Sequence, residues 1–204
     1  MHICGCEGVA GLYLCTPDGQ RLLGGWSTLS MHNIEFKAEL RDPVAARRQC
    51  ALLGAHHVGA LRQKDTYYKL LDGRLKKRES RGEPTEWIYY HRPDHVRPRM
   101  CHYTILSDEQ AKRRWGTHSL RVWLEVTKVR ELWTLANVRI HLDKVDKIGT
   151  FIEFEAVISR NFDVQECHLA INHLREVFGP TLGEPVSAGY SDLMAQALAD
   201  TPSE

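Results

Sequence analysis

The chain has 204 residues, of which 43% are hydrophobic and 26% are charged, and this composition excludes an intrinsically disordered protein. Its formal net charge of +1 gives no global attraction to nucleic acid or to an anionic membrane, so we expect neither as a partner. The sequence has no apolar run long enough to span a bilayer, and its first residues lack the features of a secretory signal, so we expect a cytoplasmic protein.

Residues 1–30 stand apart from the patterned part of the chain. They contain three of the six cysteines, Cys4, Cys6 and Cys15, but the spacing matches no paired CxxC zinc site. Zinc binding and redox chemistry stay open as alternatives for this cluster. We interpret the segment as an N-terminal extension, or as sequence upstream of a true start at Met31.

The patterned part begins with NIEFKAEL, residues 33–40, in which apolar and charged residues alternate strictly. Such alternation predicts a half-buried strand. A helix is expected over 43–53, because Asp42 can cap its N-terminus, Pro43 can occupy its first position and Gly54 can end it.

The middle of the chain is predicted to form strands joined by turns, followed by one helix. Asp72-Gly73 predicts a tight hairpin turn between two extended runs. Ser107 and Gly116 are expected to cap the two ends of the helix. The expected strands cover residues 56–71, the run after Gly73, 87–94 and 101–106, and the expected helix covers 107–116.

The second half is rich in expected strands and ends in a helix and a tail. Residues 119–135 are predicted to form a strand, a turn and part of a second strand. Asp163 and Glu166 form a capping box that predicts the start of the helix. The remaining elements are expected at 137–145 and 150–158 as strands, at 164–178 as the helix, and at 191–198 as a short helix within the tail.

The charged sides of these strands are almost purely ionic and are grouped by sign. A sheet with one face in water remains the ordinary alternative, but three like charges along one strand face repel one another unless something neutralises them. If the sheet closes into a barrel, these side chains line its interior and the apolar sides lie outside, under the helices. The interior would then hold seven basic groups, Lys37, Arg74, Lys76, Arg78, Lys128, Arg130 and Arg139, beside five acidic groups, Glu35, Glu39, Asp143, Glu153 and Glu155.

Such an interior suits phosphates and divalent metal ions. Arginine binds phosphate oxygens in bidentate geometry, and carboxylates two residues apart on a strand suit Mg²⁺ or Mn²⁺. The pattern therefore predicts phosphoryl or nucleotidyl chemistry on a chain of phosphates. His141, between Arg139 and Asp143 on the same side of its strand, is a candidate for tuning a proton transfer.

At these residues the chain resembles the CYTH superfamily, the triphosphate tunnel metalloenzymes, and within it the bacterial class IV adenylate cyclase-like branch. The resemblance implies an α+β fold: a closed eight-stranded antiparallel β-barrel, or tunnel, with a charged interior and helices packed on the outside. It places the tunnel domain at residues 31–180, between an extension at 1–30 and a tail with a short helix at 181–204. The matching segments are NIEFKAELRD, DTYYKLLDGRLKKRE, IYYHRPD, KVRELW, NVRIHLDKVDKIGTFIEFE and GYSDLM.

The resemblance also implies roles for the charged residues. The family's first-strand motif is E-x-E-x-K, and Asn33 takes the place of its first acid. Lys37 and Lys128 are candidate catalytic residues. The residues expected to bind the triphosphate are Lys37, Arg74, Lys76, Arg78, Lys128, Arg130 and Arg139, and those expected to hold Mg²⁺ or Mn²⁺ are Glu35, Asp143, Glu153 and Glu155.

We therefore expect an adenylate cyclase that converts ATP to cyclic AMP and pyrophosphate. The first alternative is a triphosphatase that hydrolyses inorganic or organic triphosphates such as tripolyphosphate or thiamine triphosphate. The second alternative is a non-catalytic module that binds a nucleotide or polyphosphate, which the loss of the first acid at Asn33 favours. The expected partner is a small-molecule triphosphate, and a homodimer stays open.

Overall fold

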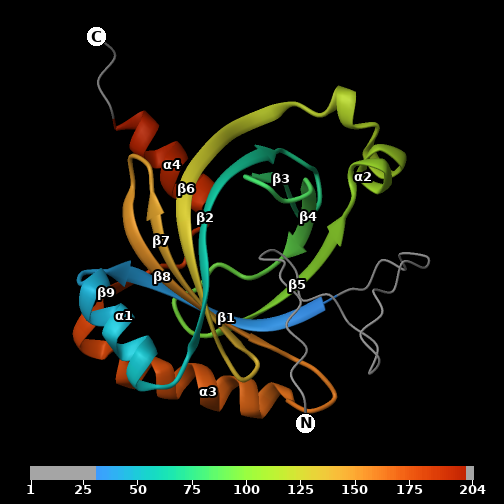
Figure 1. Ribbon diagram of the computed structural model, residues 1–204. Helices are drawn as coiled ribbons and strands as arrows, with labels where there is room; N and C mark the ends of the chain where they lie inside the picture. Colours follow the sequence, from blue (N-terminus) through green and yellow to red (C-terminus); the bar gives the residue numbers. More distant parts are fainter. Residues whose placement is uncertain (1–30, 201–204) are drawn as a thin grey trace.

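The computed structural model describes residues 31–200, which form a closed barrel with helices on its outside (Figure 1). Eight antiparallel strands lie in the order β5-β4-β3-β2-β6-β7-β8-β1, and β1 pairs with β5 to close the barrel. This arrangement confirms the predicted fold class. The cysteine cluster and the rest of the expected extension at 1–30 lie outside the described residues.

The elements follow one another largely as the sequence predicts. Helices lie between some of the strands. Two single turns of 3-10 helix, η1 and η2, connect α2 to β6 and α3 to β9. In chain order the elements are β1 (Met31–Leu40), α1 (Pro43–Leu52), β2 (His56–Tyr68), β3 (Arg74–Ser80), β4 (Glu86–His91), β5 (Arg99–Leu106), α2 (Asp108–Trp115), η1 (Thr117–Ser119), β6 (Val122–Leu135), β7 (Val138–Val145), β8 (Gly149–Val157), α3 (Val164–Val177), η2 (Gly179–Thr181), β9 (Leu182–Pro185) and α4 (Tyr190–Ala199).

One stretch differs from its prediction. The sequence predicts a turn within residues 119–135, whereas the structure has a single strand, β6, of 14 residues. This strand pairs with β2 along one edge and with β7 along the other, and the two ladders hold it extended. The predicted turn was wrong, because a continuous ladder on both sides leaves no place for one.

The connection between β2 and β3 is longer than the predicted two-residue turn, since it spans residues 69–73. Gly73 has φ 68°, in the left-handed region that favours glycine. A Cβ atom at this position would lie 2.6 Å from the ring of Tyr89. Both observations require glycine here, so the sequence located the turn correctly but not its length.

The apolar sides of β1, β7 and β8 face outward and are covered by helix. Helix α3 packs against β1 and β8, as Figure 1 shows below the barrel. The fully buried ring of Phe154 lies 6.1 Å from Phe36 and 5.3 Å from Phe178, measured between ring centroids. Burying one such side chain contributes about 1.5–3 kcal/mol. The main apolar core therefore lies between the barrel wall and α3, outside the lumen.

The chain after α3 continues the barrel. Strand β9 pairs with β1 around Ala38 and Leu40, beside the part of β1 that β5 leaves uncovered. Helix α4 packs against β6, and its Tyr190 and Met194 form a buried cluster with Tyr67, Val126, Val145 and Phe151. The expected tail thus supplies a ninth strand, and its expected helix at 191–198 is observed as α4.

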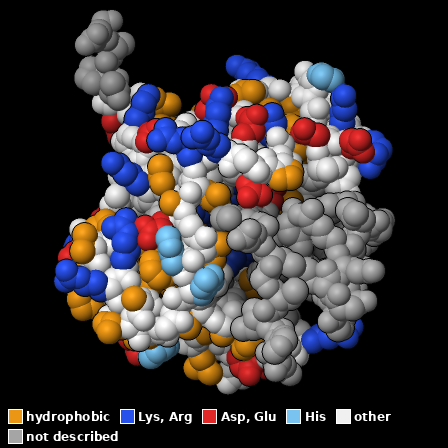
Figure 2. All heavy atoms as spheres, in the orientation of Figure 1, with side chains coloured by type: hydrophobic (Ala, Val, Ile, Leu, Met, Phe, Trp, Pro, Cys, Tyr) orange, Lys and Arg blue, Asp and Glu red, His pale blue; other side chains and the backbone are white. Residues whose placement is uncertain are grey.

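The outer surface carries charges of both signs. On the face in Figure 2, Lys and Arg side chains lie next to Asp and Glu side chains along the upper rim. Within residues 31–200, none of the helices combines the length and apolar character needed to cross a membrane.

We predict that Phe154→Ala lowers the free energy of unfolding by about 3–5 kcal/mol, because it leaves a cavity between β8 and α3. Leu169→Ala is the matched control, because this α3 residue is 61% exposed and its loss should change the free energy by less than about 0.5 kcal/mol. Chemical denaturation measures both values. Equal effects of the two substitutions would contradict the placement of the core.

Candidate active site in the barrel lumen

The charged sides of the strands point into the barrel, and the register brings them together in rows. Across β1, β8 and β7, each residue of a row lies directly opposite the next. Side chains at such positions are in contact distance of one another. The two central rows are Glu35–Glu155–Arg139 and Lys37–Glu153–His141.

Three side chains of these rows form a group that can hold a metal ion. His141, Glu153 and Glu155 each offer one ligand atom, and these atoms lie within 4.8 Å of one another. The Nδ1 atom of His141 is 3.4 Å from a Glu153 oxygen and 3.7 Å from a Glu155 oxygen. Two carboxylates and an imidazole fit a divalent cation, so the lumen is compatible with the expected cofactor.

Cations surround this triad. Glu153 pairs with Lys37 at 3.5 Å and with Arg130 at 2.8 Å, and Glu155 pairs with Arg139 at 2.7 Å. Burial raises the pKa of Glu153, but Lys37, His141 and Arg130 outweigh burial and hold that pKa well below its ordinary value. Burial likewise opposes ionisation of Glu155, and Arg139 outweighs it, so the pKa of Glu155 is lowered. Both carboxylates are therefore charged at neutral pH.

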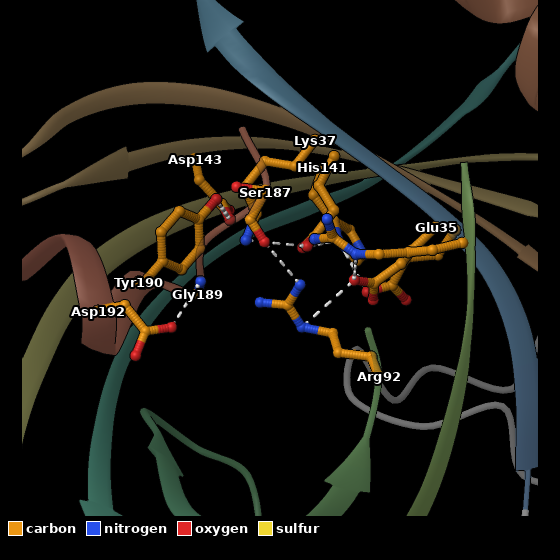
Figure 3. Close-up of polar contacts among 12 residues, drawn as sticks. Glu35, Lys37, Arg92, His141, Asp143, Ser187, Gly189, Tyr190 and Asp192 are labelled. Carbon is orange, nitrogen blue, oxygen red and sulfur yellow. Dashed lines mark hydrogen bonds and ion pairs between the residues drawn. The ribbon is translucent and has the colours of Figure 1, made fainter. Parts of the chain in front are cut away.

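Asp143 belongs to a neighbouring contact rather than to the triad. Arg130 donates two hydrogen bonds to its carboxylate, at 2.8 and 2.6 Å, and the Tyr190 hydroxyl donates a third at 2.8 Å. Burial raises the pKa of Asp143, but Arg130 outweighs burial and lowers that pKa to about 2. Tyr190 comes from α4 and points into the lumen toward Asp143 (Figure 3).

Glu35 is held by two arginines that the sequence analysis did not identify. The Nε atom of Arg99 donates to Glu35 at 2.9 Å, and the Nε atom of Arg92 lies 3.5 Å from the same oxygen. Arg92 also donates to the Ser187 carbonyl at 3.0 Å, and Figure 3 shows it reaching from the strand end toward both partners. Arg99 alternates with Cys101 along β5, a pattern that could have placed it in the lumen.

Asp65 joins three of the predicted phosphate-binding residues. Its fully buried carboxylate accepts hydrogen bonds from Arg78 at 2.8 and 3.0 Å, from Lys76 at 3.2 Å and from Lys128 at 3.0 Å. Burial raises the pKa of Asp65, but the three cations outweigh it and hold the pKa well below its ordinary value. The sequence analysis missed Asp65, although it alternates with Gln63 on the predicted strand.

Lys128 has the most strongly perturbed amine of this cluster. Its side chain is 1% exposed, and burial is the main reason why its pKa falls to about 7. Arg130, Arg78 and Lys76 repel its charge and lower the pKa further, while Asp65 opposes them. Lys128 can therefore gain or lose a proton near neutral pH.

The structure also places the remaining predicted residues. Arg74 lies nearer to solvent than the other basic residues, with its side chain 29% exposed, and donates to Asp94 at 3.1 Å. Arg139 donates to the Tyr103 hydroxyl at 3.0 Å. Glu39, which alternation places in the interior, is exposed near the end of β1, so that prediction was wrong. Residue 39 lies near the end of the strand, where β9 pairs with β1 at Ala38 and Leu40.

Comparison with known proteins gives a family and a fold. A family model described as the CYTH domain matches residues 31–163. The PH1012 protein from Pyrococcus horikoshii is similar in structure, with a TM-score of 0.65 and 24% identity over 79% of this chain and 98% of that one. A candidate adenylate cyclase from Vibrio parahaemolyticus has a TM-score of 0.64 and 16% identity over 82% and 99% of the two chains.

A third structure broadens the comparison. It is a candidate adenylyl cyclase from Hippeastrum described as having a dominant triphosphatase activity, with a TM-score of 0.53 and 14% identity over 83% of this chain and 97% of that one. At such low identities these structures establish the shared fold alone. None of the curated proteins matches the chain.

We predict that Asp65→Asn lowers the free energy of unfolding by about 3–5 kcal/mol, because it leaves three buried cations without their shared partner. Added tripolyphosphate should raise the melting temperature more in this variant than in the wild type, since the anion can take the place of the carboxylate. Thermal and denaturant unfolding measure both effects.

The matched control is Glu79→Gln, on the outer side of β3, where the carboxylate is 46% exposed and pairs with Lys77 at 3.1 Å. This surface pair should contribute less than about 1 kcal/mol. If Asp65→Asn were no less stable than this control, Asp65 would not be the residue that holds the cluster together.

Proposed function

We propose, from the premise that the chain belongs to the CYTH domain family, that it is a metal-dependent enzyme that binds a triphosphate in the lumen and hydrolyses it. The observation that supports the proposal is the set of buried ion pairs. It joins eight cations, Lys37, Lys76, Arg78, Arg92, Arg99, Lys128, Arg130 and Arg139, to five carboxylates, Glu35, Asp65, Asp143, Glu153 and Glu155.

The excess of cations makes this set a receptor for a polyanion. Three lumen cations share the single carboxylate of Asp65, so that none of them has a partner of its own. A phosphate chain offers many oxygen acceptors, and arginine binds them in bidentate geometry. We therefore propose Lys76, Arg78, Lys128, Arg130 and Arg139 as phosphate-binding residues. Arg74, nearer to solvent, would meet the far end of the substrate.

Asp65 has a positioning role in this proposal. It holds Lys76, Arg78 and Lys128 near one point before substrate arrives, and charged donors that are fixed in advance need little reorganisation during the reaction. Asp143 acts in the same way on Arg130, and its hydrogen bond from Tyr190 ties α4 to that contact.

The reaction would take place beside the triad. A divalent cation on Glu153 and Glu155 would neutralise negative charge on the phosphate oxygens. Lys128, whose pKa of about 7 the bound anion would raise, would be protonated in the complex and would stabilise charge on the phosphate oxygens, while the proton of the attacking water would pass to the phosphate product. Lys37, which lies 3.5 Å from Glu153 and 4.1 Å from the centre of the Tyr190 ring, would stabilise charge on the leaving phosphate.

We favour hydrolysis over cyclisation of ATP as the reaction of this protein, whereas the sequence resemblance favours cyclisation. Hydrolysis requires a phosphate receptor and a metal site, and the lumen contains residues suited to both. Cyclisation requires, in addition, contacts that fix the ribose. The triphosphatase activity in the description of the Hippeastrum protein is consistent with this order. Cyclisation stays as the second candidate, because the Vibrio parahaemolyticus structure is described as an adenylate cyclase candidate.

We predict that purified protein with Mg²⁺ or Mn²⁺ releases orthophosphate from tripolyphosphate or from ATP. Phosphate release and nucleotide products are measured in the same reaction, and a sample with a chelator is the control. Cyclic AMP with pyrophosphate would instead identify a cyclase. Binding of both compounds without any product would identify a non-catalytic module.

We predict that Lys76→Met raises the Michaelis constant for tripolyphosphate at least tenfold, or about 1.4 kcal/mol, because it removes one phosphate-binding cation. Asp65 keeps two cations in this variant, so the fold should survive. Lys77→Met is the matched control, because Lys77 is the next residue of β3, on its outer side, where it pairs with Glu79. An equal effect of both substitutions would show that phosphates do not bind in the lumen.

We predict that tripolyphosphate binding takes up protons between about pH 7 and pH 9. The bound anion favours the charged amine, so it raises the pKa of Lys128 from about 7 and a proton enters. Calorimetry at pH 8 in buffers with different heats of ionisation measures the uptake, without metal so that no turnover occurs. Lys128→Arg is always charged and should lose this uptake. Unchanged uptake in that variant would exclude Lys128 as the responsive group.

A further inference from the structure

The four carboxylates that the resemblance assigns to metal binding all have arginine partners, but only Glu153 and Glu155 converge with a third ligand, His141. Glu35 lies between the buried side chains of Arg99 and Arg92, and Arg130 donates to both oxygens of Asp143. The side chains of Glu35 and Asp143 are 8% and 0% exposed, so water screens these pairs little. Breaking such a pair leaves a buried arginine without its partner. Because Glu35 and Asp143 are not part of the group of converging ligand atoms, no shared metal site would offset that cost.

The first strand offers a metal ion little else. Asn33 stands where the family motif has an acid, and its amide brings no charge. The Oδ1 atom of Asn33 is buried and has no hydrogen-bond partner, and the carboxylate of Glu35 is not part of the triad. The ligands that converge therefore come from β7 and β8, not from β1.

The composition of the triad points to a class of metal. Imidazole suits first-row transition ions, whereas Mg²⁺ favours an all-oxygen environment. His141 replaces one oxygen by nitrogen, and carboxylates remain good ligands for Mn²⁺. A mixed set of one nitrogen and two carboxylates thus favours a transition-metal dication over Mg²⁺.

We propose that the lumen holds one transition-metal dication on His141, Glu153 and Glu155, and that Glu35 is a positioning residue for Arg99 and Arg92. This inference rests on the proposed function, because it concerns the metal of the same reaction. It differs from the metal set that the resemblance implies, since Glu35 and Asp143 leave that set and His141 enters it.

Metal and triphosphate should bind together. Lys37, Arg130 and Arg139 pair with the triad carboxylates and repel a second cation. A polyanion in the lumen draws these cations to its own oxygens and frees the carboxylates. Arg139 and Arg99 each have one buried nitrogen without a hydrogen-bond partner, Nε and Nη2, so both have a donor for the anion. The two ligands therefore raise each other's affinity.

The test measures metal binding rather than turnover. Mn²⁺ is titrated into the protein and followed by electron paramagnetic resonance, alone and with the bis-methylene analogue of tripolyphosphate, which cannot be hydrolysed. We expect one Mn²⁺ per chain, bound at least about tenfold more tightly with the analogue and at least about tenfold more tightly than Mg²⁺ in competition. Electron spin echo measurements should detect the nitrogen nucleus of a coordinated imidazole.

Variants separate the ligands from the positioning residue. His141→Gln should lose the nitrogen signal, and both His141→Gln and Glu153→Gln should weaken Mn²⁺ binding at least about tenfold. Glu35→Gln should change Mn²⁺ affinity by less than about threefold, because Glu35 is not a ligand. His102→Gln, on the outside of the barrel, is the control for surface histidines and should keep the nitrogen signal.

Three outcomes would overturn the inference: no bound Mn²⁺ in either titration, bound Mn²⁺ without a nitrogen signal, or a Glu35→Gln variant as impaired as Glu153→Gln. Failure of the proposed function is recognised separately. A protein that releases orthophosphate but shows no nitrogen signal refutes this inference alone. A protein with the nitrogen signal but without phosphate release keeps the site and refutes the hydrolytic function.

Discussion

The structure depends on one constraint, which is that a charge taken out of water must have a partner. The cost of burying an unpaired ion is several kcal/mol, and among residues 31–200 the lumen contains thirteen ion-paired groups, of which eight are cationic and five anionic. Each carboxylate therefore holds one or more cations, and Asp65 holds three. Such an interior is stable enough to fold, yet its cations outnumber their partners and can bind an anion.

The apolar core on the outside of the barrel offsets the cost of burying these charges. The apolar core lies between the strands and α3, where Phe154, Phe36 and Phe178 are almost completely buried. The hydrophobic effect thus stabilises the wall of the barrel, and packing density in the core does not depend on the lumen. This separation leaves the inward side chains free to serve binding and chemistry. It also explains why charged residues alternate with apolar ones along the same strands.

Much of this arrangement follows from the sequence, because alternation decides the face of each residue. Glu153, Glu155 and Arg130 were predicted to lie in the lumen from that pattern alone. Alternation does not predict the ion-pair partner of a charged residue, because pairing depends on the register between strands that are far apart in the chain. Alternation could have placed Asp65 and Arg99 in the lumen but does not show which charges they hold, and Tyr190 was missed because a helix, not a strand, brings it into the lumen.

The central claim is that a triphosphate replaces carboxylates as the partner of the lumen cations. A crystal structure of the protein with Mn²⁺ and the bis-methylene analogue of tripolyphosphate tests it most directly. The account predicts phosphate oxygens at hydrogen-bond distance from Lys76, Arg78 and Lys128, with at least one of these cations moved away from Asp65. An analogue bound outside the barrel, with all three cations still on Asp65, would contradict the account.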